Sequence, residues 1–93
     1  MTTAAAVSRT LTILNKRGLH ARAAAKFVKL ADLYEADIQV SKSGTTVSGL
    51  SIMGLMMLAA APGSTIDVTA TGPQAAEAVD AIDQLVADKF GEE

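Results

Sequence analysis

The sequence lacks cysteine and tryptophan, and its 93 residues include a single histidine, His20, and a single tyrosine. The absence of cysteine excludes disulfide scaffolds, thiolate zinc sites and thiol catalysis. With only one histidine as well, we expect no structural metal site and no bound cofactor. Aromatic residues make up 3% of the chain, which argues for close-packed helices and sheet and against a small-molecule regulatory domain with an aromatic pocket.

The sequence also has no strong excess of positive or negative charge and no long apolar run. Eight Lys and Arg against ten Asp and Glu give a net charge of -2, and no long basic run occurs, so nucleic acid is a poor candidate partner. The apolar residues 50–61 are too few to span a bilayer, and Ser51 and Gly54 interrupt them. The stretch MTTAAAVSR lacks the basic start and apolar core of a signal peptide. These features predict a cytoplasmic protein without membrane insertion.

The hydrophobic pattern predicts one domain over residues 7–93, preceded by a flexible tail over residues 1–6. Alternation of apolar and polar residues predicts strands at Val7–Leu14, around Ile38 and Val40, at Thr45–Ser48 and at Ile66–Ala70, whereas helical spacing predicts helices at Ala21–Leu33, at Leu50–Leu58 and from Pro73 to Phe90. The order is therefore β-α-β-β-α-β-α. We expect an α+β open-faced β-sandwich, in which three helices cover one face of a four-stranded antiparallel sheet.

The stretch GLHARAAAKF, residues 18–27, places His20 where a loop meets a helix. The first backbone N–H groups of a helix have no internal partner, and together with the helix dipole they attract phosphate. Arg22 adds a forked cation, and Lys16 and Arg17 raise the positive field. A helix start disfavours a protonated ring, which leaves a neutral imidazole to attack phosphorus, and no orienting carboxylate is evident nearby. The alternative is a surface or capping histidine.

The stretch GLSIMGLMML, residues 49–58, contains three of the four methionines. It is either buried core or a docking surface, because a helix this short buries only one side. We expect Ile52 and Leu55, with Met56 as a further candidate, to face inward, and Met53, or Met57 and its neighbours, to be partly exposed. Ser51 is expected to cap this helix, with a modification site as the alternative.

The two motifs GLHARAAAKF and LSIMGLMMLAAAPGSTIDVTATGPQAAEAV closely resemble the HPr family, the histidine-containing phosphocarriers of the phosphoenolpyruvate-dependent phosphotransferase system. The pattern is also similar to the nitrogen-related NPr branch of that system. The resemblance runs from Ser8 to Phe90 and implies the β-α-β-β-α-β-α fold. It implies a carrier, not a turnover enzyme, whose His20 accepts a phosphoryl group on Nδ1 from phosphorylated enzyme I and passes it to an enzyme IIA domain. Arg22 matches the family arginine that steadies this group.

The resemblance also assigns roles to the second motif. Ser51 matches the serine that a dedicated kinase, HPr kinase/phosphorylase, phosphorylates in some members. Ile52, Met53 and Met56 match the apolar patch that docks partners, and the protein is expected to be a monomer. An unphosphorylated regulatory protein that docks through Met53 and Met56 is the alternative function.

Two positions depart from the family pattern. Ala23 stands where proline usually follows the motif arginine, and Arg17 stands where a small polar residue often precedes the motif glycine. Alanine is an excellent helix former and keeps its N–H, so we expect function to survive the first departure.

Overall fold

The structure is a computed structural model that describes residues 6–92. The expected flexible tail therefore lies, apart from Ala6, outside the described residues. The elements follow the predicted order: β1 (Val7–Thr12), α1 (Ala21–Ala31), β2 (Asp37–Lys42), β3 (Thr45–Ser48), α2 (Ile52–Met57), β4 (Thr65–Thr71), α3 (Ala75–Ala87) and a 3₁₀ turn (Lys89–Gly91). Among these residues, none of the helices has the length and apolar character needed to cross a membrane.

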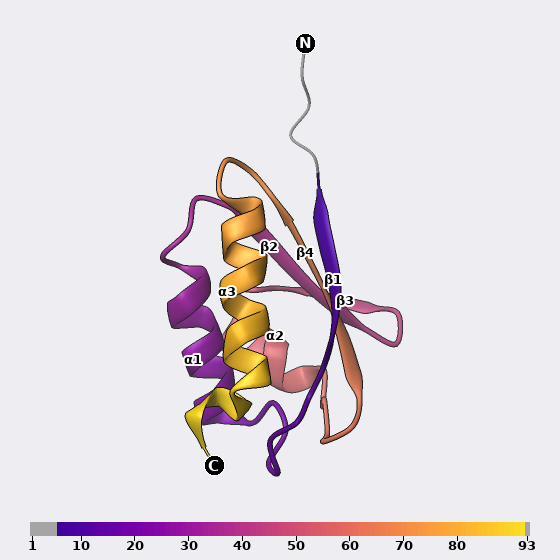
Figure 1. Cartoon of the computed structure of the whole chain (residues 1–93). Helices are drawn as coiled ribbons and strands as arrows, with labels where there is room; N and C mark the ends of the chain where they lie inside the picture. Colours follow the sequence, from indigo (N-terminus) through magenta and orange to yellow (C-terminus); the bar gives the residue numbers. More distant parts are fainter. Residues whose placement is uncertain (1–5, 93) are drawn as a thin grey trace.

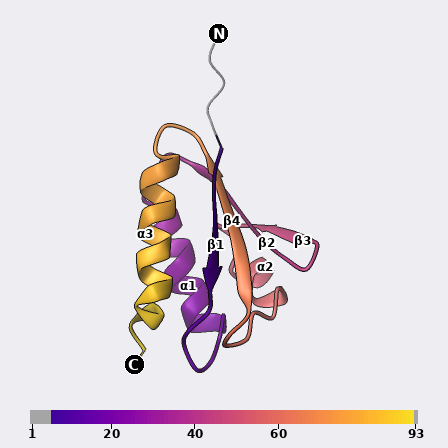
Figure 2. The same cartoon turned by 45° about the vertical axis from the view of Figure 1, so that its right-hand side comes forward.

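The strands form one antiparallel sheet in the order β1-β4-β2-β3, which confirms the expected fold class. Because β4 lies between β1 and β2, these two run parallel and α1 crosses from one to the other. In the same way α2 leads from β3 to β4 across β2. Both crossovers place their helices on the same side of the sheet, where α3 joins them (Figures 1 and 2).

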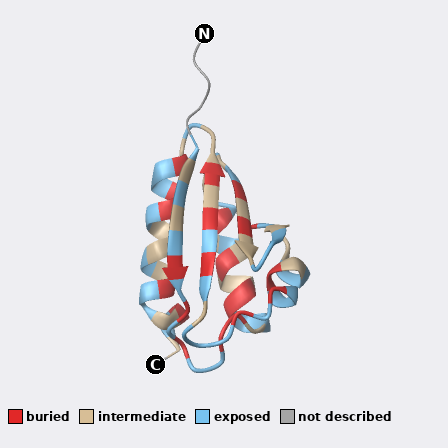
Figure 3. Cartoon of the chain, turned by 90° about the vertical axis from the view of Figure 1, so that its right-hand side faces the viewer, coloured by how far each residue is buried: buried red, intermediate tan, exposed pale blue. Residues whose placement is uncertain are grey.

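The core fills the space between the sheet and the helices. In β4, Ile66, Val68 and Ala70 are buried, while Asp67 between them is exposed. Figure 3 looks onto the open face of the sheet and shows this alternation of buried and exposed residues along the strands. On the open face Thr10 Oγ1 donates to Asp67 Oδ1 at 2.6 Å. The sheet therefore packs against helices on one face and presents polar side chains on the other.

Two predicted elements end earlier in the structure than in the sequence pattern. β1 stops at Thr12 instead of Leu14, and α1 stops at Ala31 instead of Leu33. At the end of α1 the N–H of Leu33 donates to the carbonyl of Leu30 at 3.1 Å, three residues back. Such a bond tightens the last turn and ends the helix, which leaves Leu33 exposed.

The last helix is also shorter than predicted at both ends. Pro73 was expected in its first turn and Phe90 in its buried stripe, but α3 begins at Ala75 and ends at Ala87. Phe90 lies in the following 3₁₀ turn with a φ of +54°, a left-handed conformation that no α-helix contains. Its side chain is nevertheless buried, so its place in the core was correct and its place in the helix was wrong.

Candidate functional site

His20 lies where the loop after β1 meets α1, as predicted. Its backbone is extended, with φ -81° and ψ -178°, and its carbonyl accepts the first helical hydrogen bond from Ala24 N at 2.8 Å. The amides of Ala21, Arg22 and Ala23 consequently have no acceptor within the helix. The His20 side chain makes no capping hydrogen bond to them. The helix start therefore has N–H donors without acceptors inside the helix, and together with the helix dipole they favour an anion there.

Ala23, the position where the family resemblance leads us to expect proline, contributes to this set of donors. It is the third residue of α1 and is fully buried. A proline would have no N–H there, whereas alanine keeps one and continues the helix without strain. The departure therefore adds a donor at the helix start.

The loop that carries His20 is fixed by a close approach to the segment after α2. Gly18 has a φ of +64°, and the next residue, Leu19, donates its N–H to Ala60 O at 2.9 Å. A Cβ on Gly18 would lie 2.3 Å from Ala60 O, closer than side-chain carbons approach backbone oxygens, so only glycine fits. The N–H of His20 donates in turn to Gly18 O at 2.9 Å, which links this fixed turn directly to the histidine.

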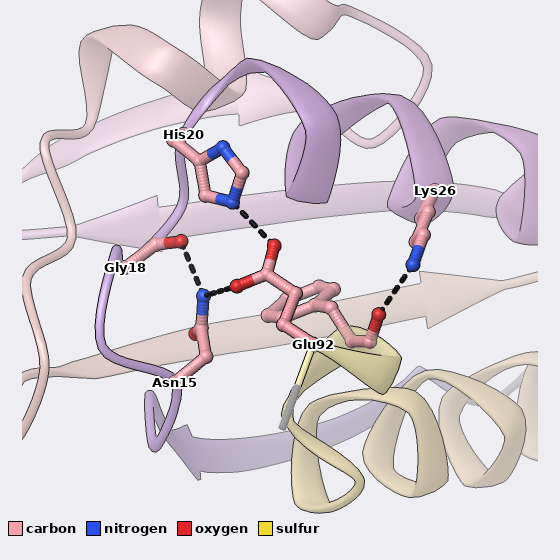
Figure 4. Close-up of polar contacts among 6 residues, drawn as sticks. Asn15, Gly18, His20, Lys26 and Glu92 are labelled. Carbon is pink, nitrogen blue, oxygen red and sulfur yellow. Dashed lines mark hydrogen bonds and ion pairs between the residues drawn. The ribbon is translucent and has the colours of Figure 1, made fainter.

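A carboxylate faces the His20 ring, which corrects the expectation that no orienting carboxylate lies nearby. Glu92 follows the 3₁₀ turn, and its Oε2 contacts His20 Nε2 (Figure 4). The other oxygen, Oε1, accepts from Asn15 Nδ2 at 2.9 Å, and the same Nδ2 donates to Gly18 O at 2.8 Å. Glu92 and His20 are 72 residues apart in the sequence, so no local spacing could indicate their contact.

The surroundings of Glu92 keep its carboxyl group ionised. Burial alone would raise the pKa of this carboxyl group. Hydrogen bonds from Asn15 and His20, together with the charges of His20 and Lys26, have a larger opposite effect, so the pKa is lowered from the ordinary value of 4.5. Because the folded-state pKa is depressed, the carboxylate stabilises the fold above pH 4.5, and this contribution is lost as the pH falls through the lowered pKa. Near neutral pH an anion therefore faces the histidine.

Cations surround a hollow beside this carboxylate. The hollow has a volume of 530 Å³ and is lined by Lys16, Arg17, Arg22, Lys26, Gly91 and Glu92. A second hollow of 240 Å³ is lined by His20 and residues 59–62, and Arg17 and Leu19 border it too. The structure thus places Arg22 and His20 in adjoining hollows that share Arg17. Four cationic side chains at one helix start create a strong positive potential, suited to a phosphoryl group.

Ser51 caps α2, which confirms the first interpretation of this residue. Its Oγ accepts the N–H of Gly54 at 2.9 Å. A Cβ on Gly54 would lie 2.9 Å from that oxygen, so glycine leaves room for the serine hydroxyl. The cap satisfies one of the free amides at the start of a helix of six residues.

The methionine-rich helix is shorter than the predicted residues 50–58, and this changes which side chains are exposed. Leu55 is buried as expected, but Ile52, expected to face inward, is 40% exposed. In so short a helix only the middle residue reaches the core, and the first turn stays at the surface. Met53 is 73% exposed and Met56 is 42% exposed. Ile52, Met53 and Met56 are the α2 patch, and α2 packs against α1, the helix that His20 begins (Figure 1).

Comparison with known proteins extends the likeness over nearly the whole chain. The family model described as the PTS HPr component phosphorylation site matches residues 7–88. Phosphocarrier protein HPr of Cupriavidus necator is 48% identical over 86 residues, which cover 92% of this chain and 97% of that protein. Phosphocarrier protein NPr of Shewanella violacea is 43% identical over 86 residues, covering 92% and 94%. The crystal structure of HPr-C-His from Thermoanaerobacter tengcongensis has a TM-score of 0.89 at 41% identity, covering 94% and 98%.

Proposed function

Because the chain belongs to the HPr family of phosphocarriers, we propose that it is a stoichiometric relay in which His20 accepts a phosphoryl group from phosphorylated enzyme I and passes it to an enzyme IIA domain. The observation that carries the proposal is the position of His20 at the open start of α1, beside a hollow lined by Lys16, Arg17, Arg22 and Lys26. The proposed carrier is a cytoplasmic monomer that works without a cofactor or metal ion.

The chemistry assigned to this site is a displacement at phosphorus. The lone pair of a His20 ring nitrogen forms the new bond to phosphorus, while the bond to the donor atom breaks and its electron pair returns to the donor. In this proposal the planar guanidinium of Arg22, which lines the cationic hollow, and the N–H groups at the start of α1 stabilise the charge on the phosphoryl oxygens. The reverse displacement on an acceptor then returns His20 to its starting form, so the protein carries the group and does not consume it.

Incubation with enzyme I and phosphoenolpyruvate tests the relay. Native mass spectrometry should show one phosphoryl group per chain on a monomer, the group should be labile in acid, and it should leave when an enzyme IIA domain is added. A protein that takes up no acid-labile phosphate, or that keeps it in the presence of several enzyme IIA domains, contradicts the proposal.

The relay serves either sugar uptake or nitrogen-related regulation, and both branches are included in the proposal. Parallel assays with the enzyme I of each branch decide between them, since the cognate enzyme I should load His20 with the higher kcat/KM.

We also propose that the α2 patch docks the protein partners of the relay. Met53→Asp places a charge in the middle of this apolar surface, and we expect it to weaken binding to enzyme I by about tenfold or more, as for a central interface residue. The matched control is Leu33→Asp, because Leu33 is 74% exposed, against 73% for Met53, and follows the end of α1 that is opposite to His20. Calorimetric titration of enzyme I with both variants measures the difference.

Equal binding of the two variants would remove the docking role from the α2 patch. The exposure of this patch also favours a second function, in which the unphosphorylated protein regulates a metabolic protein by docking to it. Binding of that kind should be lost in Met53→Asp and unaffected in His20→Ala.

Ser51 is proposed as a regulatory site for HPr kinase/phosphorylase in addition to its capping role. Ser51→Ala removes the acceptor for Gly54 N and should cost about 1 kcal/mol of stability in urea unfolding. Ser51→Asp keeps a good capping oxygen, so its stability should stay near that of the wild type, while its charge beside the α2 patch slows transfer from enzyme I. Two results together would show that Ser51 only caps the helix. These are a transfer rate for Ser51→Asp equal to that of the wild type, and no phosphate on Ser51 of the wild type after incubation with an ATP-dependent kinase.

A further inference from the structure

The side chain of Glu92 lies between Asn15 and His20 and is held on both sides. Its carboxylate oxygens contact Asn15 Nδ2 and His20 Nε2, and the side chain is only 12% exposed (Figure 4). The orientation of the Asn15 amide is fixed, because Nδ2 faces two acceptors, Gly18 O and Glu92 Oε1, and the reversed amide would face them with an oxygen. The carboxylate therefore has one defined position against the ring.

Asn15 holds this position at some cost to folding. It is fully buried, and within residues 6–92 its Oδ1 has no hydrogen-bond partner. A buried acceptor without a partner is unfavourable, and such a group calls for a compensating role. The only polar contacts that Asn15 makes through its side chain among the described residues are those that fix Gly18 and Glu92.

The contact decides where the ring carries its proton. An ionised carboxylate can only accept hydrogen bonds, so the nitrogen that faces it must donate, and Nε2 therefore carries the hydrogen of the neutral imidazole. The lone pair is then on Nδ1, which lies on the side of the ring away from Glu92 and has no hydrogen-bond partner among the described residues (Figure 4). We propose that Glu92, fixed by Asn15, is a positioning residue that keeps the proton on Nε2 and presents Nδ1 of His20 as the nucleophile.

The charge of Glu92 then assists the transfer itself, an inference that rests on the proposed function. As Nδ1 bonds to phosphorus and the bond to the donor atom breaks, the electron pair leaves with the donor and positive charge develops on the ring. The proton on Nε2 stays in place, hydrogen-bonded to the carboxylate, so no proton has to be moved. A buried carboxylate in this position stabilises the charged ring, as an orienting carboxylate does behind a catalytic histidine.

The turn that carries Glu92 is built to hold it. Lys89 and Phe90 both have a φ of +54°, a backbone angle that residues other than glycine rarely adopt. The ring of Phe90 is buried, and its carbonyl accepts from Lys26 Nζ at 2.6 Å, a contact to α1. The strained backbone, the buried ring and this contact together bring Glu92 to the start of the same helix that His20 begins.

The opposite role is that Glu92 competes with the incoming phosphoryl group, because it also lines the cationic hollow. The two roles predict opposite effects of removing its charge. If Glu92 competes with the phosphoryl group, Glu92→Gln should accept phosphate faster than the wild type. If Glu92 positions the ring, Glu92→Gln should accept phosphate more slowly. The defined contact to Nε2, and not to Arg22 or Arg17, favours the positioning role.

The test combines the unphosphorylated protein with the transfer reaction. The 15N chemical shifts of the His20 ring at alkaline pH report which nitrogen carries the proton, and we expect the Nε2–H form to dominate in the wild type and both forms to be populated in Glu92→Gln. The rate of phosphoryl transfer from enzyme I should fall roughly 10- to 100-fold in the same variant, as for other groups that orient a functional histidine. Glu77→Gln, an exposed change in the first turn of α3, is the matched control and should leave both measurements unchanged.

Each other outcome overturns the inference. If the proton position on the His20 ring is unchanged in Glu92→Gln, the carboxylate does not determine which nitrogen carries the proton. If the proton position changes but the transfer rate is unchanged or faster, the proton position does not assist transfer. A wild type that accepts no phosphate contradicts the proposed function instead, and the ring measurement, which needs no phosphate, still decides whether Glu92 positions the proton.

Discussion

Replacing His20 with alanine is expected to abolish uptake of acid-labile phosphate from enzyme I. The chain has no second imidazole, and neither hydroxyl groups nor carboxylates form the acid-labile bond between phosphorus and nitrogen that the relay requires. The effect is therefore a complete loss and not a slower reaction. Phosphate per chain, measured by mass spectrometry after incubation with enzyme I and phosphoenolpyruvate, should remain at zero in His20→Ala when the wild type is fully loaded.

The control for this loss is a change in the same turn that leaves the nucleophile in place. Arg22→Ala removes a cation that lines the hollow but not the ring, so it should still accept phosphate, more slowly, and reach the same final loading. His20→Ala should remain folded, because Glu92 keeps its hydrogen bond from Asn15 and the ring is not part of the core. Acid-labile phosphate on the folded His20→Ala protein would contradict the assignment of the acceptor.

The sequence predicted those features that depend on neighbours along the chain. The alternation Ile66, Val68, Ala70 predicts the buried face of β4, because the side chains of a strand point to opposite faces in turn. The start of α1 at Ala21 follows from the change to helical spacing after Gly18. Both motifs are local, and so the resemblance to a family was visible before any fold was known.

The contacts that complete the site could not be predicted in this way. Asn15, Glu92 and His20 meet only because α3 returns the chain to the start of α1. The pattern of apolar residues does not indicate which polar side chains are brought into contact there. A local signal for a turn was Gly91, a residue type that often follows a helix, and in the structure it lies in the 3₁₀ turn with a φ of +72°. Even so, Phe90 was placed inside the helix, because a buried aromatic at helical spacing looks the same whether the helix continues or turns.

Phe90→Ala is expected to have one of the largest effects on stability, because this buried ring anchors the last turn to the core. Phe90 is 1% exposed, and truncating a buried phenylalanine costs about 3–5 kcal/mol. A small domain has about 5–15 kcal/mol in total, so the variant should lose a large part of its stability. The midpoint of urea unfolding should shift to lower urea while the slope stays the same, which separates a loss of stability from a change in the unfolded state. A shift equivalent to less than about 1 kcal/mol, the typical cost of an ordinary substitution, would show that the ring does not anchor the turn.

Phe27→Ala separates this anchoring from stability in general. Phe27 is also fully buried, but it belongs to α1 and not to the turn that carries Glu92. Both variants should lose a similar free energy of unfolding. Under conditions in which both are folded, only Phe90→Ala should also release Glu92 and populate both proton positions on the His20 ring, because the carbonyl that Lys26 binds and the carboxylate that His20 binds belong to the same turn. If Phe27→Ala changes the ring to the same extent, the position of Glu92 depends on the stability of the whole core; if it does not, the last turn alone sets the position of the functional histidine.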